Sequence, residues 1–229
     1  MKESICLGLN AEGIIPGKLQ LSKRAKSIYN NKIENEPTEV KRTRLLTAYA
    51  YAVSETNASG GEIVTAPTCG SCGVLPATLY YLQKEDKYTD EEIINALATA
   101  GIIGNIVKTN ASISGAECGC QAEIGTACSM AAAACSQLRK LDIYKIEHAA
   151  EIAMEHHLGL TCDPIYGYVQ IPCIERNAVA AIRAIDASNI SMLLDENQKI
   201  SFDLITETMY ETGKDLRSHY RETLSLIHI

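Results

Sequence analysis

The chain has 229 residues, of which 46% are hydrophobic and 21% are charged, and its formal net charge is −7. This is an ordinary globular composition, and the length allows one sizeable domain with a substantial core. The net negative charge and the lack of a long Lys/Arg run exclude a basic nucleic-acid-binding surface. No apolar run is long enough to span a membrane, and MKESICLGLN lacks the apolar stretch of a signal peptide. We therefore expect a cytoplasmic protein that binds neither nucleic acid nor membrane.

The patterns along the chain predict helices and no strands. Residues 1–38 are mixed, with a turn-rich loop at GIIPGKLQ, and a helix then runs from Pro37 to the Gly60–Gly61 pair. Another helix begins at YTDEE, where Thr89 or Asp90 can cap it. Further helices are predicted over ATLYYLQ, the Ala-rich segment ending in SMAAAACSQL, DIYKIEHAAEIAMEHHLG, IERNAVAAIRAIDAS and FDLITETMYETGKD. We expect a single all-α domain over residues 1–229, with the Ala-rich helix at the centre of a bundle whose loops converge.

Nine cysteines in a chain expected in a reducing compartment need a role other than disulfide formation. Cys120, Cys162 and Cys173 lie where loops are predicted to become helices, and backbone donors there favour a thiolate. Their wide spacing matches no compact metal motif, so spacing alone leaves open whether they are ligands or small buried residues. Cys128 and Cys135 lie inside the Ala-rich helix and are expected to be small core residues.

Cys69 and Cys72 form a C-x-x-C within TAPTCGSCG. Alone, this motif is typical of a thioredoxin-like site or half of a zinc site, but the chain has neither a βαβ pattern nor a second C-x-x-C. His157 lies close enough in sequence to Cys162 to be a candidate neighbour of that thiol.

Two polar loops are candidates for binding a small substrate. In TAPTCGSCG, Thr65 and Thr68 offer hydroxyls, while Gly70 and Gly73 let backbone N–H groups approach a carboxylate. A tight turn between helices is the alternative interpretation of this loop. In NASISG, Ser112 and Ser114 are weaker candidates that could instead cap a helix.

Four segments occur in the order GGEIVTAPTCGSCGVLPA, NASISGAECGCQAEIGTACSMAAA, EHHLGLTCDPIYGYVQIPCIERNA and MYETGKDLRSHYRET. At these motifs, over roughly residues 40–223, the chain resembles the alpha chain or alpha domain of the iron–sulfur-dependent bacterial L-serine dehydratases. The resemblance implies a [4Fe–4S] cluster on three cysteines, at the positions of Cys120, Cys162 and Cys173, with one iron left open to substrate. It further implies a lyase that converts L-serine to pyruvate and ammonia without pyridoxal phosphate.

In this family the open iron would act as a Lewis acid on the serine hydroxyl. The resemblance places a base-bearing histidine motif in a beta-type chain or domain, so no catalytic base is assigned here, and we expect a beta partner and an oligomer. Residues 1–229 are interpreted as an alpha-type domain truncated at both ends. Cys69 to Cys72 and Cys118 depart from the family pattern. A related iron–sulfur lyase such as L-cysteine desulfidase, or a non-catalytic metal-stabilised or redox-sensing module, are the alternatives.

Overall fold

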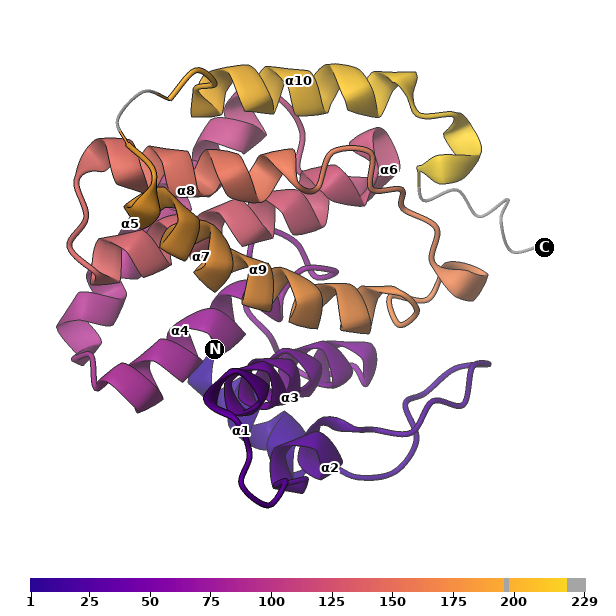
Figure 1. Cartoon of the computed structure of the whole chain (residues 1–229). Helices are drawn as coiled ribbons and strands as arrows, with labels where there is room; N and C mark the ends of the chain where they lie inside the picture. Colours follow the sequence, from indigo (N-terminus) through magenta and orange to yellow (C-terminus); the bar gives the residue numbers. More distant parts are fainter. Residues whose placement is uncertain (196–197, 222–229) are drawn as a thin grey trace.

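The structure is a computed structural model that describes residues 1–195 and 198–221. The all-α prediction is confirmed, since these two ranges contain helices and turns but no β-strand (Figure 1). In the same ranges, no helix is both long and apolar enough to cross a membrane. The α-helices in chain order are α1 (Lys2–Asn10), α2 (Ala25–Asn30), α3 (Thr38–Ala58), α4 (Val74–Asp86), α5 (Asp90–Asn110), α6 (Gly115–Cys118), α7 (Thr126–Leu138), α8 (Ile143–Glu155), α9 (Cys173–Leu193) and α10 (Phe202–Asp215). A π-helical turn, η1 (Gln121–Gly125), precedes α7, and short 3₁₀ turns occupy η2 (Ile165–Gly167) and η3 (Ser218–Tyr220).

Helix α7 is the centre of the molecule, as its composition predicted. All of its residues except Gln137 are buried, and α7 packs against α4, α5, α8 and α9. Its many alanine side chains let the neighbouring helices approach closely. Cys128 and Cys135 on this helix are fully buried, which agrees with their prediction as core residues.

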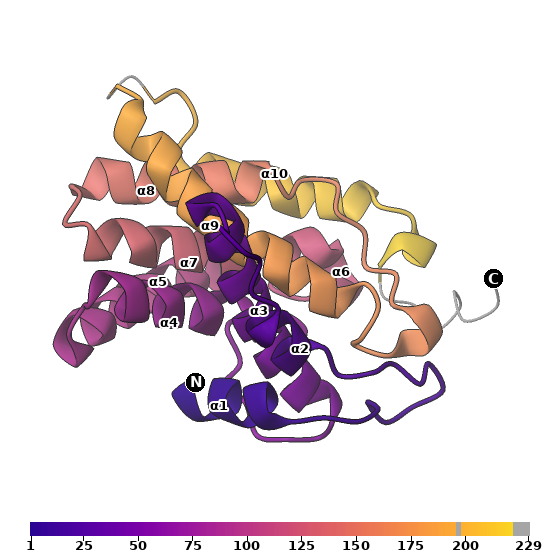
Figure 2. The same cartoon turned by 60° about the horizontal axis from the view of Figure 1, so that its bottom comes forward.

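The other helices form layers on either side of this centre. Helix α3 packs against α9, and α1 and α2 cover α3, whereas α10 packs on α8 and α6 at the opposite side (Figures 1 and 2). The loops that precede α4, α7 and α9 contact one another. They carry Cys69 and Cys72, Cys120, and Cys162, respectively.

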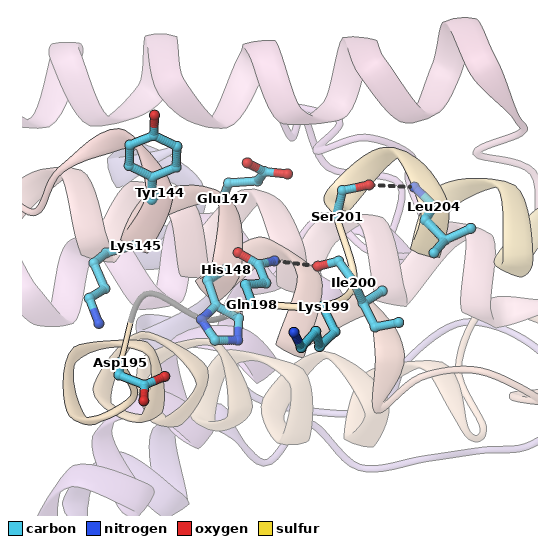
Figure 3. A pocket seen from close by; sticks show the side chains of 10 residues that line it. All are labelled: Tyr144, Lys145, Glu147, His148, Asp195, Gln198, Lys199, Ile200, Ser201 and Leu204. Atoms are coloured by element: carbon cyan, nitrogen blue, oxygen red, sulfur yellow. Dashed lines mark hydrogen bonds between the residues drawn. The ribbon is translucent and has the colours of Figure 1, made fainter.

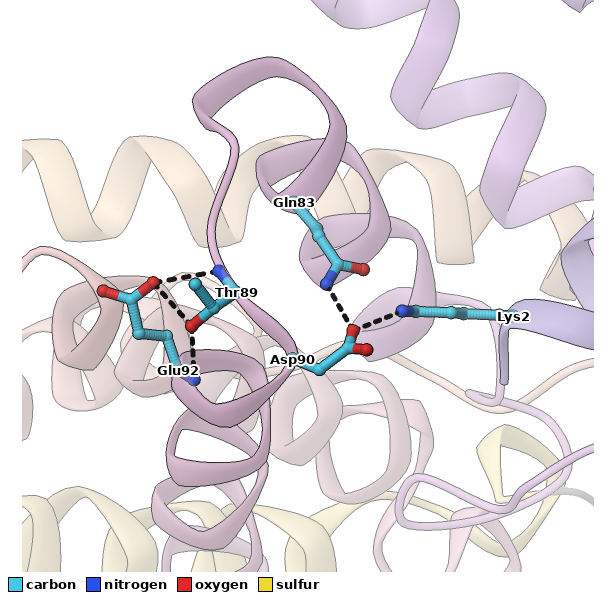
Figure 4. Close-up of polar contacts among 5 residues, drawn as sticks. All are labelled: Lys2, Gln83, Thr89, Asp90 and Glu92. Atoms are coloured by element: carbon cyan, nitrogen blue, oxygen red, sulfur yellow. Dashed lines mark hydrogen bonds and ion pairs between the residues drawn. The ribbon is translucent and has the colours of Figure 1, made fainter.

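The start of α5 confirms the predicted cap. Thr89 accepts a hydrogen bond from the Glu92 backbone N–H, and the Glu92 side chain accepts one from the Thr89 N–H, forming a capping box (Figure 4). The neighbouring Asp90 accepts hydrogen bonds from Lys2 at 2.7 Å and Gln83 at 2.8 Å. These contacts connect the beginnings of α1 and α5 with the end of α4.

Helices α1 and α2 were not predicted from the sequence, because residues 1–38 show no clear helical pattern. Helix α1 has only nine residues, and it buries Ser4, Ile5 and Gly8. A Cβ atom at Gly8 would lie 2.1 Å from the Ala52 carbonyl oxygen, so α1 and α3 are in direct backbone contact. Tertiary packing of this kind stabilises short helices that lack a strong periodic signal.

Candidate metal centre

Cys120 lies at the entrance to the π-helical turn η1, and its side chain is 1% exposed. The turn brings Glu123 back toward this thiol, so that Cys120 Sγ donates to Glu123 Oε2 over 3.9 Å. Single π-helical turns are frequently found at functional sites. The local prediction for Cys120, a thiol where a loop becomes a helix, is confirmed.

Cys162 lies within a loop rather than at a helix start, which differs from the expectation. Its backbone N–H donates to the Tyr220 carbonyl at 2.8 Å, and the residue forms an isolated bridge with Arg221. That N–H is therefore engaged in a main-chain contact and does not stabilise the sulfur of Cys162. The side chain itself is buried, with 3% exposure.

Arg176 and Gln121 fix the loop around Cys162. Arg176, from the first turn of α9, donates to the Thr161 carbonyl at 2.7 Å and to Asp163 Oδ1 at 3.2 Å. From the other side, Gln121 is fully buried and accepts from the Gly159 N–H at 2.8 Å, while its own N–H donates to the Leu160 carbonyl at 3.1 Å. The residue that follows Cys120 thus ties down the segment that leads to Cys162.

The ligand atoms of Cys120, Glu123 and Cys162 lie within 4.8 Å of one another. Gly115, at the start of α6, borders this group: a Cβ atom there would lie 2.9 Å from Cys162 Sγ and 3.3 Å from Glu123 Oε2. A glycine at this position allows α6 to come so close. Two buried thiols and a half-buried carboxylate therefore share one small space.

Cys173 is the first residue of α9, as predicted, and is 6% exposed. It lies outside the compact group of three but is tied to the same loops. Its carbonyl accepts from Asn177 Nδ2 at 2.8 Å, and the same amide nitrogen donates to the Gly70 carbonyl at 2.7 Å. Asn177 Oδ1 in turn accepts from the Gly73 N–H at 2.8 Å.

The TAPTCGSCG loop reaches the centre through Thr68 and Gly70. Thr68 Oγ1 donates to Glu123 Oε1 and lies 3.0 Å from Ser71 Oγ. A Cβ atom at Gly70 would lie 2.5 Å from Glu123 Oε1, so the loop backbone packs directly on the carboxylate. Thr65, by contrast, is exposed.

The remaining candidates for substrate binding are engaged in contacts within the protein. Gly73 gives its N–H to Asn177, and a Cβ there would lie 2.7 Å from the Ala50 carbonyl oxygen, so close packing accounts for this glycine. Ser112 donates to Glu117 Oε2 at 2.5 Å and accepts from the Ser114 N–H at 3.1 Å. Ser114 is the N-cap residue of α6, but its side chain makes no capping hydrogen bond. It directly precedes Gly115, which borders the thiols.

The other thiols and His157 lie outside the compact group. Cys69 is exposed, whereas Cys72 is fully buried, and burial raises the pKa of its thiol to about 12. His157 is buried next to Gly125 at the end of η1, and burial lowers its pKa to about 4, so its imidazole is neutral at pH 7. Its Nδ1 lies 2.7 Å from the Ala153 carbonyl, which makes Nδ1 the protonated nitrogen.

Four residues of the centre were not singled out by sequence reasoning: Gln121, Glu123, Arg176 and Asn177. All lie within the motifs that carry the cysteines. Glu123 is three residues after Cys120, and Asn177 is four after Cys173, which are helical spacings that place side chains on one face. That spacing was the available signal.

A separate cavity of about 360 Å³ lies between the start of α8, the segment before α10 and the first turn of α10 (Figure 3). Lys145, His148, Asp195 and Lys199 are among the residues that line it. None of the described residues that line this cavity is a cysteine, so it is distinct from the thiol centre.

The fold and this centre define an all-α protein with a buried group of thiols and a carboxylate suited to a metal. A family model described as "Serine dehydratase alpha chain" matches residues 1–227, and the chain belongs to this family. It is 49% identical to an L-serine dehydratase of Haemophilus influenzae and to L-serine dehydratase TdcG of Escherichia coli, with 97% of this chain and 50% of each relative covered. The L-serine dehydratase of Streptomyces coelicolor is 46% identical, with 97% and 49% covered. The chain spans about half the length of the curated relatives it matches.

Proposed function

We propose that this chain is the alpha part of an L-serine ammonia-lyase, which deaminates L-serine to pyruvate and ammonia with a [4Fe–4S] cluster on Cys120, Cys162 and Cys173. One observation carries the proposal: the family's cysteine motifs, far apart in sequence, place two buried thiols within 4.8 Å of each other and of Glu123. Thiolates are the ligands that iron–sulfur clusters use. Family membership supports serine as the substrate.

The donor set fits such a group. All three cysteines are at most 6% exposed, and Gln121, Arg176 and Asn177 hold the segments that carry them. Cys173 lies outside the compact group of three, and a multi-iron cluster accommodates this because each cysteine binds a different iron. Three protein thiols leave one iron open, as a catalytic zinc site leaves one position open.

When bound, the cluster would supply Lewis-acid polarisation of the serine hydroxyl, which is otherwise a poor leaving group. The chain's own residues would position the substrate against it. Of the proposed substrate residues, Thr68 and Gly70 border Glu123 and are best placed to touch the substrate, together with exposed Thr65. Gly73, Ser112 and Ser114 would act through the loops that they stabilise.

The elimination removes a proton from Cα and hydroxide from Cβ, which gives aminoacrylate; tautomerisation and hydrolysis of the imine then release pyruvate and ammonia. We propose that the base comes from a beta-type chain or domain and that the enzyme is an oligomer. We also propose that it works in the cytosol, where thiol ligands stay reduced, and that residues 1–229 form one alpha-type domain.

Anaerobic reconstitution followed by iron and sulfide analysis tests the cluster. We expect iron and acid-labile sulfide in equal amounts in the wild type and a marked loss of both in Cys162→Ala. Cys128→Ala is the matched control, because Cys128 is equally buried but sits within α7, and it should keep its iron. A Cys162→Ala protein with a full cluster would contradict the ligand assignment.

The activity is tested with the complete enzyme by measuring pyruvate release from L-serine and sulfide release from L-cysteine. We expect serine-dependent pyruvate. Cysteine-dependent sulfide without pyruvate would instead indicate the related desulfidase, and a cluster whose spectrum does not respond to serine would indicate a non-catalytic module.

A further inference from the structure

Glu123 lies between the TAPTCGSCG loop and the thiols, and it contacts both. Its Oε1 accepts from Thr68 Oγ1, and its Oε2 lies 3.9 Å from Cys120 Sγ. Both carboxylate oxygens lie close to Gly70: a Cβ atom built on this glycine would be 2.5 Å from Oε1 and 2.9 Å from Oε2. This carboxylate is therefore enclosed by the loop on one side and by the thiols on the other.

Neighbouring protein groups hold the Glu123 carboxylate in position. The bond from Thr68 orients it, and Gly70 and Gly115 leave no room for other side chains next to it. Glu123 is half-buried, and a carboxylate in such a place is best stabilised by charge-assisted hydrogen bonds. Because cysteine ligands bind metals as thiolates, the surroundings of Glu123 would be negative, and a cation is the complementary ligand.

We propose that Glu123 binds the α-ammonium group of the amino-acid substrate and thereby selects amino acids over carboxylic acids that lack this group; the assignment rests on the proposed function. Serine carries its ammonium and its hydroxyl on adjacent carbon atoms. A hydroxyl that faces a metal on Cys120 and Cys162 places the ammonium a few ångströms away, which is where the Glu123 carboxylate lies. The substrate carboxylate, on the same carbon as the ammonium, would then face the loop at Thr68 and Gly70.

The test uses L-alanine and propanoate, which differ by the ammonium group and cannot lose water. Their dissociation constants are measured by calorimetry on the complete, cluster-loaded enzyme. The wild type should bind L-alanine at least about tenfold more tightly than propanoate, since a charge-assisted bond is worth about that much or more. Glu123→Gln should weaken L-alanine binding about 10- to 100-fold and leave propanoate binding and iron content unchanged.

Glu175→Gln is the matched control, because Glu175 is an exposed carboxylate two residues after Cys173; neither ligand's affinity should change. Equal affinity of the wild type for the two ligands would overturn the proposal without recourse to any variant. So would an equal loss for both ligands, or a loss of iron, in Glu123→Gln, because Glu123 would then act on the loop or the cluster. Pyruvate release from serine tests the proposed function separately. An enzyme that releases no pyruvate but binds L-alanine more tightly than propanoate would contradict the proposed function and not the role of Glu123.

Discussion

Asn177 connects the first turn of α9 to the loop that precedes α4 with a single amide. It is 1% exposed, and its side chain satisfies the carbonyls of Gly70 and Cys173 and the N–H of Gly73. Buried backbone groups of this kind need a partner. The relative positions of the loop and Cys173 therefore depend on this one side chain.

We expect Asn177→Leu to lower the free energy of unfolding by about 2 kcal/mol or more, because the buried Gly70 carbonyl and Gly73 N–H lose their partner at about 1–3 kcal/mol each. Urea unfolding measures the change. Asn95→Ala, at an exposed position of α5, is the control and should change stability by less than about 0.5 kcal/mol. Equal effects of the two substitutions would contradict the role given to Asn177.

Residue-level sequence signals located the cysteines but not their neighbours. Pro172 before Cys173 indicated a helix start, and the Gly-rich segment before Cys120 indicated a loop, and both are local features. The contact of Thr68 with Glu123 joins residues 55 positions apart. Such a contact depends on how α4, α7 and α9 pack, which spacing along one sequence does not encode; the family resemblance supplied the grouping of the three cysteines.

Among the elements, α10 is held against α6 by a glycine. A Cβ atom at Gly213 would lie 2.5 Å from the Cys118 Cβ, so no side chain fits there. At Gly101, in the interior of α5, nothing lies within 4 Å of the equivalent position. The same substitution at these two helical glycines should therefore have opposite effects.

Gly213→Ala should destabilise the protein by about 1–3 kcal/mol, because the helices must move apart. Gly101→Ala should stabilise it by up to about 1 kcal/mol through the better helix propensity of alanine. Thermal unfolding of the two variants and the wild type provides the comparison. A gain in stability for Gly213→Ala would show that α10 is not packed on α6 as described.

Elements with strong local signals were predicted well. Helix α3 ends at Ala58, just before the Gly60–Gly61 pair, as expected, and α5 begins at the predicted cap. Helices α1 and α2 escaped prediction because they are short and depend on contact with α3. Local propensity and capping therefore account for the long helices, and tertiary packing accounts for the rest.

At the scale of the whole molecule, stability should depend on pH through buried His157. Its pKa is lowered from 6.5 to about 4, mainly by burial. Between these two pH values the unfolded chain binds a proton at this residue that the folded chain does not, so acidification favours unfolding. Buried Glu151 acts in the opposite direction over an overlapping range, because burial and the nearby Glu155 and Glu147 raise its pKa to about 7.

His157→Asn separates the two effects, since an Asn amide can replace the Nδ1 bond to the Ala153 carbonyl without titrating. The stability of the wild type relative to this variant should fall by about 2–3 kcal/mol between pH 7 and pH 4.5. Urea unfolding at the two pH values measures this difference, in which the contribution of Glu151 cancels. A constant difference would mean that His157 titrates normally in the folded protein.

The central helix α7 has a consequence for how this protein can change over evolution. Nine of its thirteen residues are alanine, serine or cysteine, and four other helices pack on it. The room at each position is therefore limited by the neighbouring backbones, so volume restricts replacement here more than polarity does. Buried Ser129 and Ser136 are compatible with this helix because they are small and find hydrogen-bond partners on adjacent helices. Evolutionary change in this protein is therefore expected mainly in the loops around the thiols, because the helix that packs beneath them is restricted to small residues.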